Sequence, residues 1–169
     1  LFACNGTDVH VVNLGAGAVS ATWTTDTDTI AFANGRLIGT DGAEIFEFTD
    51  LGSTKTSLWT HPDSSYTWTR IVGAPNAIYA AGKSGDGDKS QVYAINVIDA
   101  TGALSPPFWA MSLPDGEAVN DMAFYGGVMI VATTRGIRLA LITGSGYLSH
   151  GPLIEITGAP AIANGAGVQ

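Results

Sequence analysis

Residues 67–97 read TWTRIVGAPNAIYAAGKSGDGDKSQVYAINV, and this stretch decides the fold. Its strand-like runs are Thr67–Gly73, Ala77–Gly82 and Gln91–Val97. The gaps between these runs are rich in turn-forming residues: Pro75-Asn76 in the first gap and the longer Ser84–Lys89 in the second. Short apolar or alternating runs separated by such gaps are typical of β-hairpins. We therefore expect three consecutive antiparallel strands here.

The same order of strands and turns recurs on both sides of this stretch. A strand, a tight turn, a strand rich in small residues, a hairpin turn, an alternating strand and a Gly-rich link follow one another, and then a fourth strand closes the unit. The fourth strands are marked by Trp23, Trp59, Trp109 and Ile154, which are 36, 50 and 45 residues apart. Units of roughly 40 to 50 residues with four strands each predict a β-propeller.

We accordingly predict an all-β fold, a β-propeller of four-stranded antiparallel blades that forms a partial ring of about four blades. The approximate blades are 1–28, 29–65, 66–117 and 118–159, with the start of the next strand at 160–169. A β-sandwich with regular hairpins is the alternative fold. Four blades could also close if the strand around Ile162 completed the first sheet. Because the sequence begins within a strand at Leu1, we favour about half of a six- to eight-bladed ring.

The composition excludes several classes of protein. The net charge of −8 argues against a nucleic-acid partner, since phosphate contacts require Lys and Arg. No apolar run is long enough for a membrane span. The single cysteine, Cys4, permits neither an internal disulfide nor a Cys-based zinc site, and its place in a strand predicts a buried, unreactive thiol.

Propeller topology assigns each loop to one of two faces. Links from a fourth strand to the next first strand, and hairpins between second and third strands, share one face. The acids at or beside that face are Asp8, Asp26, Asp28, Asp41, Asp63, Asp86, Asp88, Asp115 and Glu117. Only Asp50 and Asp99 fall on the other, where Gly, Ala, Ser, Thr and Asn prevail. We expect the acidic face to be exposed or to attract cations, and the other to pack on another domain or subunit.

The candidate ligand-binding residues all come from loops of the acidic face. They are Asp26, Asp28, Asp63, Tyr66, Asp115 and Glu117. Asp86 and Asp88 alternate with glycines, a pattern that lets carboxylates converge on Ca²⁺, although the loop lacks the distal Glu of an EF-hand. A solvated hairpin loop is the simpler interpretation of both aspartates, and no other cofactor is expected.

Catalysis has little support in the sequence. There is no Gly-x-Ser-x-Gly motif and no pair of histidines at metal-ligand spacing. A propeller glycosidase would need two facing carboxylates, for which Asp63 with Asp115 or Glu117 are the candidates. We predict that the protein is not an enzyme and that most of its aromatic residues pack in the core.

The stretch from Gly73 to Gly82, GAPNAIYAAG, and the stretch from Gly85 to Tyr93, GDGDKSQVY, resemble part of a blade in the minor tail proteins of long-tailed phages that infect actinobacteria. This resemblance directly covers about a quarter of the chain. It implies a propeller-like structural domain of the virion, at the tail tip and outside the cell, that takes part in host adsorption. It implies no catalytic residues.

The leading hypothesis is therefore a non-enzymatic segment of a phage tail protein. Its expected partners are other tail proteins or domains of the same chain, together with a cell-wall glycan of the host. The alternative is a secreted or cell-surface bacterial propeller that binds carbohydrate or protein.

Overall fold

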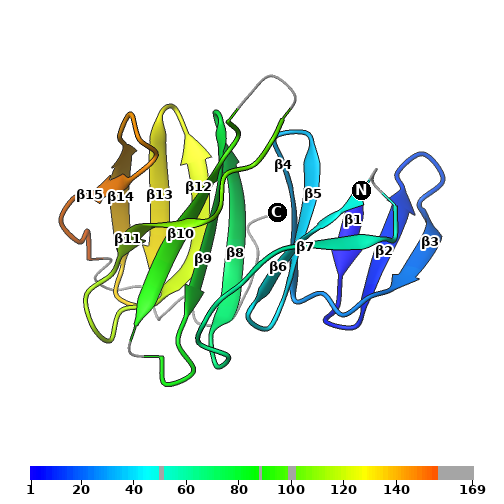
Figure 1. Ribbon diagram of the computed structural model, residues 1–169, viewed down its shortest axis with the longest axis horizontal. Coiled ribbons are helices and arrows are strands. Elements are labelled where there is room, and N and C mark those ends of the chain that lie inside the picture. Colours follow the sequence, from blue (N-terminus) through cyan, green and yellow to red (C-terminus); the bar gives the residue numbers. More distant parts are fainter. Residues whose placement is uncertain (50–51, 88, 99–101, 156–169) are drawn as a thin grey trace.

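The computed structural model describes residues 1–49, 52–87, 89–98 and 102–155, and within these residues it contains fifteen β-strands and no α-helix. The strands form four antiparallel sheets, in each of which every strand pairs with its neighbour in the chain (Figure 1). Three sheets have four strands and the first has three. The all-β fold of propeller blades predicted from the repeat is confirmed.

We number the sheets as blades 1 to 4 in chain order. Blade 1 consists of β1 (Phe2–Cys4), β2 (Asp8–Asn13) and β3 (Ala18–Thr24). Blade 2 consists of β4 (Thr29–Ala33), β5 (Arg36–Asp41), β6 (Glu44–Phe48) and β7 (Lys55–Thr60). Blade 3 consists of β8 (Thr67–Ala74), β9 (Ala77–Lys83), β10 (Ser90–Asn96) and β11 (Phe108–Ser112). Blade 4 consists of β12 (Val119–Tyr125), β13 (Val128–Thr133), β14 (Ile137–Ile142) and β15 (Leu148–His150).

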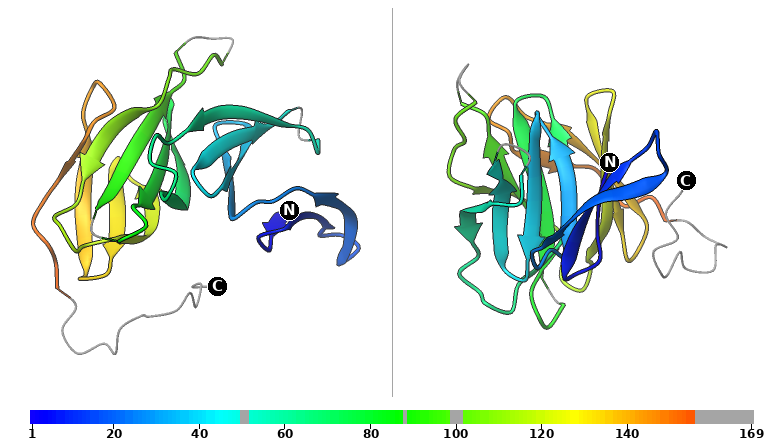
Figure 2. Two further views of the ribbon diagram at one scale, coloured as in Figure 1. Left: turned by 60° about the horizontal axis from the view of Figure 1, so that its bottom comes forward. Right: turned by 90° about the vertical axis from the view of Figure 1, so that its right-hand side faces the viewer.

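The four blades follow one another along an open arc, with blade 1 at one end and blade 4 at the other (Figure 2). β8, the first strand of blade 3, lies against the first strands of both neighbouring blades, β4 and β12. The blades therefore approach most closely at their first strands, which we call the inner strands. The strand around Ile162 lies outside the described residues.

The core consists of three layers, each between two consecutive blades. Val9 of blade 1 packs with Leu37, Phe46 and Phe48 of blade 2. The second layer joins Ile38 and Ile45 of blade 2 to blade 3 residues such as Ile71 and Ile78. A third layer joins blades 3 and 4, and among its members are Tyr79, Val92, Met129, Val131 and Ala140. A sheet with apolar residues on both faces is suited to this arrangement, because each face is covered by a neighbouring blade.

The tight turns between first and second strands form as predicted from their residues. Asn34 and Gly35 both have positive φ, 50° and 78°, which is the type I′ geometry that favours Asn-Gly in two-residue hairpins. This turn sets the register in which Ala33 pairs with Arg36. The side-chain amide of Asn34 also donates a 2.9 Å hydrogen bond to the carbonyl of Ala77, so the turn of blade 2 is tied to blade 3.

Two details of the fourth strands differ from the prediction. The fourth strand of blade 4 is β15, while Ile154 forms an isolated bridge with Ile137. Trp109 does not occupy the position of Trp59. Both pairs of strands have a register shift at the same place, but Trp59 pairs with Ile45 before the shift, whereas Trp109 pairs with Tyr93 after it.

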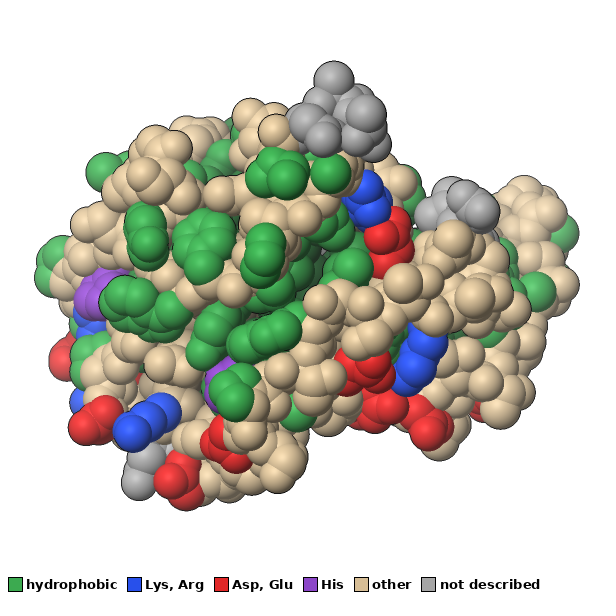
Figure 3. Space-filling view, viewed as in Figure 1, with side chains coloured by type: hydrophobic (Ala, Val, Ile, Leu, Met, Phe, Trp, Pro, Cys, Tyr) green, Lys and Arg blue, Asp and Glu red, His purple; other side chains and the backbone are tan. Residues whose placement is uncertain are grey.

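Met111, two residues after Trp109, occupies the inter-blade position of Trp59. Met111 pairs with Val92, as Trp59 pairs with Ile45, and Met111 is buried between blades 3 and 4. Trp109 is instead 49% exposed. Hydrophobic side chains are visible over β10 and β11 in Figure 3.

Gly82 lies at a closely packed position of blade 3. A Cβ added to Gly82 would lie 2.3 Å from Cε1 of Tyr66 and 2.6 Å from the carbonyl oxygen of Thr67. We expect Gly82→Ala to lower the free energy of unfolding by about 1 to 3 kcal/mol, as overpacking does. Gly144→Ala is the matched control, since nothing lies within 4 Å of its added Cβ. Urea denaturation measures both variants, and equal stabilities would contradict the packing described.

Candidate functional site

The loops of the acidic face form one connected structure, which we call the link face. It consists of the links between blades, residues 25–28, 61–66 and 113–118, and of the hairpins 5–7, 42–43, 84–87 and 134–136. Gly6 and Thr27 exchange two backbone hydrogen bonds of 3.2 and 3.3 Å, which tie the first link to blade 1. On the other side, the amide of Asp28 donates to the carbonyl of Thr40 in blade 2 at 2.7 Å. The first link is thus held by the blades on both of its sides.

The second and third links are attached in the same manner. The amide of His61 donates to the carbonyl of Ala43 at 2.9 Å, and the amide of Gly85 donates to the hydroxyl of Ser65 at 3.2 Å. In the third link, Leu113 donates to the carbonyl of Ser90 at 2.9 Å. The repeated attachment makes the link face a fixed platform.

The six predicted ligand-binding residues divide into two groups. Asp26, Asp28, Asp63 and Asp115 are exposed on the link face. Tyr66 and Glu117 are buried, with 2% and 0% of their surfaces exposed. The latter two are therefore corrected to structural residues, because a side chain without exposed surface does not meet a ligand.

Asp28 and Asp63 organise the loops in which they lie. Oδ2 of Asp28 accepts a 2.8 Å hydrogen bond from the amide of Gly42 in the neighbouring hairpin. Oδ1 of Asp63 accepts hydrogen bonds from the hydroxyl and the amide of Ser65, at 2.7 and 2.9 Å. These two bonds, the hydroxyl first, lower the pKa of Asp63 and favour its charged form.

The expected calcium loop is only partly described. Asp86 is exposed and accepts a hydrogen bond from the hydroxyl of Ser84, whereas Asp88, like Asp50 and Asp99, lies outside the described residues. Among the residues that the structure does describe, no three His, Cys, Asp or Glu side chains are grouped as a metal site would require.

An aromatic cluster that the sequence analysis missed lies where the second link enters blade 3. Its members are Trp59, His61, Tyr66, Trp68 and Tyr93. The His61 ring stacks on Tyr66, with 3.9 Å between centroids and an interplanar angle of 15°. Trp59 lies 5.1 Å from Tyr93, and Trp68 lies 4.9 Å from Tyr66. The cluster joins blade 2 to blade 3 through ring contacts.

Hydrogen bonds fix the polar atoms of this cluster. The amide of Asp63 donates to Nδ1 of His61 at 3.1 Å, so Nε2 carries the proton and donates to the Tyr93 hydroxyl, also at 3.1 Å. The Tyr66 hydroxyl donates to the carbonyl of Gln91 at 3.2 Å. Burial raises the pKa of Tyr66 far above its ordinary range. Tyr66 and Trp68 are two residues apart, which is the spacing of residues on the same face of an extended chain. This spacing was the signal in the sequence that both rings point into the cluster.

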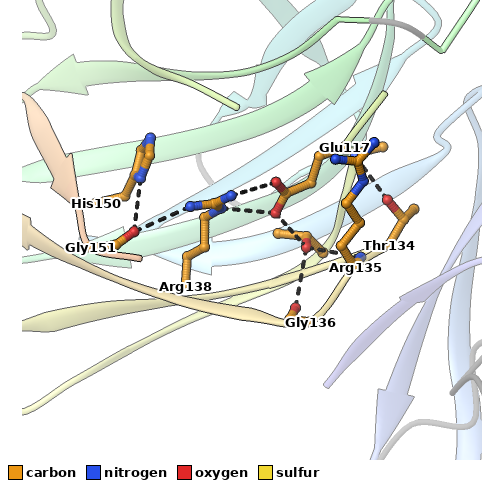
Figure 4. Close-up of polar contacts among 9 residues, drawn as sticks. Glu117, Thr134, Arg135, Gly136, Arg138, His150 and Gly151 are labelled. Atoms are coloured by element: carbon orange, nitrogen blue, oxygen red, sulfur yellow. Dashed lines mark hydrogen bonds and ion pairs between the residues drawn. The ribbon is translucent and has the colours of Figure 1, made fainter. Parts of the chain in front are cut away.

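The second buried polar group is an ion pair between Glu117 and Arg138. The two side chains point toward one another between the third link and β14 (Figure 4). Glu117 accepts from Nε of Arg138 at 2.9 Å and from Nη2 at 2.7 Å, the bidentate geometry that suits a guanidinium. Oε1 also accepts a 2.7 Å hydrogen bond from the hydroxyl of Thr133.

This pair holds together three parts of blade 4. Glu117 lies in the link, Thr133 ends β13, and Arg138 reaches the carbonyl of Gly151 beyond β15 at 3.2 Å. The hydrogen bonds from Arg138 lower the pKa of Glu117, against the opposing effect of burial. Both carboxylate oxygens of Glu117 are thus engaged by the side chains of Arg138 and Thr133.

Cys4 is half-buried, and burial raises the pKa of its thiol. A raised pKa disfavours the thiolate, which is the nucleophilic form. The thiol is thus less buried than predicted, and its low reactivity stays a prediction.

The opposite face contains a cleft of about 340 Å³ between blades 3 and 4. Its walls include Asn76 and Asn96 of blade 3 and Thr143 and Ser145 of blade 4. None of the residues that line it is charged. The hydroxyl of Tyr79, which also lines the cleft, donates to the carbonyl of Gly146 at 2.9 Å and so joins blade 3 to blade 4.

Comparison with known proteins places the chain near no characterised family. No family model matches the sequence, and no curated protein matches it. Among solved structures, the chain is similar to one described as the extracellular domain of a one-component system from B. thetaiotaomicron, with 14% identity and a TM-score of 0.46. That similarity covers 88% of this chain and 25% of the other, so this chain spans about a quarter of the length of the protein it matches.

The described residues contain no helix of the length and apolar character needed to cross a membrane.

Proposed function

We propose that the chain is a non-enzymatic section of a β-propeller protein, which acts as a scaffold and presents its link face to a ligand outside the cell. The resemblance of residues 73–93 to phage tail proteins favours the tail tip of a virion as the setting. There the chain contacts other tail proteins or domains and adsorbs to a cell-wall glycan of the host.

The observation that carries this proposal is the combination of exposed carboxylates with firmly held loops. Asp26, Asp28, Asp63 and Asp115 are exposed on links that hydrogen bonds attach to the blades. Loops on a rigid scaffold are a common location of binding residues. Beneath these loops, Glu117 and Arg138 are buried and each neutralises the charge of the other, so we assign this pair a structural role in the scaffold.

Retention of the 169-residue chain on insoluble actinobacterial cell-wall glycan tests the binding role. We expect Asp26→Asn/Asp115→Asn to reduce retention about tenfold, corresponding to about 1.4 kcal/mol of binding free energy. Glu47→Gln/Asp121→Asn removes the same charge from side chains outside the link face and should bind normally. Absence of retention of the unmodified chain would eliminate the glycan, and equal loss in both variants would eliminate the link face.

The virion setting has a separate test. Peptides of this chain should be found by mass spectrometry in purified phage particles. Their presence only in culture supernatant or on bacterial surfaces would favour the secreted propeller instead.

A further inference from the structure

Small residues keep the cleft between blades 3 and 4 open at positions where blade 2 has an ion pair. Ala77 pairs with the last residue of the preceding strand across a two-residue turn, and Arg36 has the same position in blade 2. Ala94 pairs with the third residue of β9, as Glu47 pairs with the third residue of β5. Two methyl groups of blade 3 therefore correspond to the two charged side chains of blade 2.

Between blades 2 and 3, the side chain of Arg36 spans the gap. Its Nη1 atom lies 2.6 Å from Oε2 of Glu47, and its Nη2 atom donates to the carbonyl of Gly102, in the hairpin between β10 and β11. Gly146 has the corresponding place in blade 4, since each glycine has a positive φ and precedes the residue whose carbonyl closes its hairpin. Ala77 is too short to reach Gly146, and the cleft of about 340 Å³ remains open.

Hydrogen bonds hold both walls of this cleft in place. In blade 3, the amide of Val97 donates to the carbonyl of Asn76 at 2.9 Å. In blade 4, the amide of Gly146 donates to the carbonyl of Thr143, also at 2.9 Å. The hydroxyl of Tyr79 connects the two walls through its hydrogen bond to Gly146. A cleft with ordered walls binds a ligand at a smaller cost in conformational entropy.

The polar residues that line the cleft are neutral. They include Asn76 and Asn96 of blade 3 and Thr143 and Ser145 of blade 4. Amides and hydroxyls both donate and accept hydrogen bonds, as the hydroxyl groups of a sugar do. A charged ligand would lose its hydration in the cleft without gaining a counterion from the lining residues. The lining therefore favours a ligand that is polar and uncharged.

Apolar residues, among them Ile98 and Ile142, line the cleft beside these polar ones. A sugar ring carries C–H groups next to its hydroxyls and so matches a lining of both kinds. The volume lies within the range of about 300 to 1,000 Å³ that is usual for small-molecule sites. We propose that the cleft binds one ring of a neutral sugar, either free or as a unit of a glycan. This site lies on the face opposite the link face and does not depend on the binding role proposed above.

Nuclear magnetic resonance spectra of the ¹⁵N-labelled chain show where a sugar binds. Titration with N-acetylglucosamine should shift the amide signals of Asn76, Thr143 and Ser145. We expect a dissociation constant of about 1 mM, as the ligand efficiency of a molecule with about 15 non-hydrogen atoms implies. Absence of shifts at these residues, or shifts confined to the link face, would overturn the proposal.

Two further probes define the class and the source of the ligand. Glucuronate is charged and should bind about tenfold more weakly than N-acetylglucosamine. Equal or tighter binding of glucuronate would contradict a site for neutral sugars. Tri-N-acetylchitotriose distinguishes the source, because tighter binding of this trimer supports a unit of a glycan and equal binding supports a free sugar.

Substitutions in the cleft test its lining. Thr143→Val/Ser145→Ala removes two hydroxyls with little change in volume and should raise the dissociation constant about tenfold. Ser53→Ala/Thr54→Val is the matched control, since it removes the same groups from the equivalent hairpin of blade 2, between β6 and β7, and it should bind normally. Equal affinities of these two variants would overturn the proposal.

Filling the cleft is an independent test. Ala77→Arg introduces the side chain that blade 2 has at the same position, and it should abolish sugar binding with an unchanged circular dichroism spectrum. If the folded Ala77→Arg variant bound N-acetylglucosamine as the unmodified chain does, the sugar would not lie in the cleft. The hydroxyl variant tests the same point without adding volume to the core.

Discussion

Glu117→Ala should lower the free energy of unfolding by about 3 to 5 kcal/mol at pH 7, because it leaves a buried charge without its partner. The side chain of Arg138 is only 10% exposed and has its Nε and Nη2 atoms directed at the carboxylate. Removing Glu117 also removes the nearer acceptor of the Thr133 hydroxyl, at 2.7 Å, and leaves it only the carbonyl of Gly136 at 3.2 Å. Blade 4 should therefore be destabilised where the link, β13 and β14 meet.

An exposed ion pair with a single close contact provides the control. Asp121 lies 2.8 Å from Arg70, but their side chains are 61% and 45% exposed. Asp121→Ala should lower the free energy of unfolding by no more than about 1 kcal/mol, as is usual for the loss of a surface ion pair. Replacing the buried pair together, as Glu117→Leu/Arg138→Met, should recover much of the loss. Guanidinium denaturation measures all three variants, and equal costs for Glu117→Ala and Asp121→Ala would contradict the assigned burial.

The same pair predicts a dependence on pH. The folded-state pKa of Glu117 lies below its ordinary value of 4.5, so its charged form is favoured in the folded protein. The resulting stabilisation is complete above the unfolded-state pKa and is lost as the pH falls through the folded-state pKa. The difference in stability between the unmodified chain and Glu117→Gln should thus shrink between pH 6 and pH 3. A constant difference would argue against ionisation as its source.

Trp68→Ala should have a comparable effect through a different mechanism. Trp68 is 3% exposed, and its indole N–H donates a 3.0 Å hydrogen bond to the carbonyl of Ala43 in blade 2. Truncating a buried tryptophan creates a cavity and costs about 3 to 5 kcal/mol. The rings of Tyr66 and Trp59, at 4.9 and 6.0 Å, also lose a partner.

The control for Trp68 is the same substitution at an exposed position. Trp109 is 49% exposed, so Trp109→Ala should cost about 1 kcal/mol or less. Thermal unfolding followed by near-ultraviolet circular dichroism reports both stability and the order of the aromatic cluster. A near-ultraviolet spectrum of Trp68→Ala identical to that of the unmodified chain would show that the cluster does not depend on this ring.

The fold was largely predictable because its hairpins depend on local chemistry. Asn34-Gly35 and Asp41-Gly42 favour positive φ through their own residues, and Gly35 and Gly42 adopt it. Since each strand pairs with its neighbour in the chain, correct turns nearly determine the sheets. The repeat of turns was therefore sufficient to predict blades without knowledge of any distant contact.

The site was less predictable because burial depends on distant partners. Glu117 lies in a polar loop and resembles a solvated acid, but its partner Arg138 is 21 residues away in another element. The available signal was Arg138 itself, a charged residue among the apolar residues of β14. The orientation of Trp109 was hidden because the blade 3 equivalent of Trp59 is Met111, so matching tryptophan to tryptophan misaligned the two strands by two residues.

The pairing of each strand with its neighbour in the chain also affects how the molecule folds and how its gene can evolve. Most contacts join residues close in the sequence or in adjacent blades, so ordering can begin in any blade and spread to its neighbours. Loss of one blade then removes nearest-neighbour contacts and leaves the remainder of the series intact. Duplication of a whole blade adds a sheet whose two faces can pack on the neighbouring blades. Such a gene can therefore encode a longer propeller without a new kind of hydrophobic core.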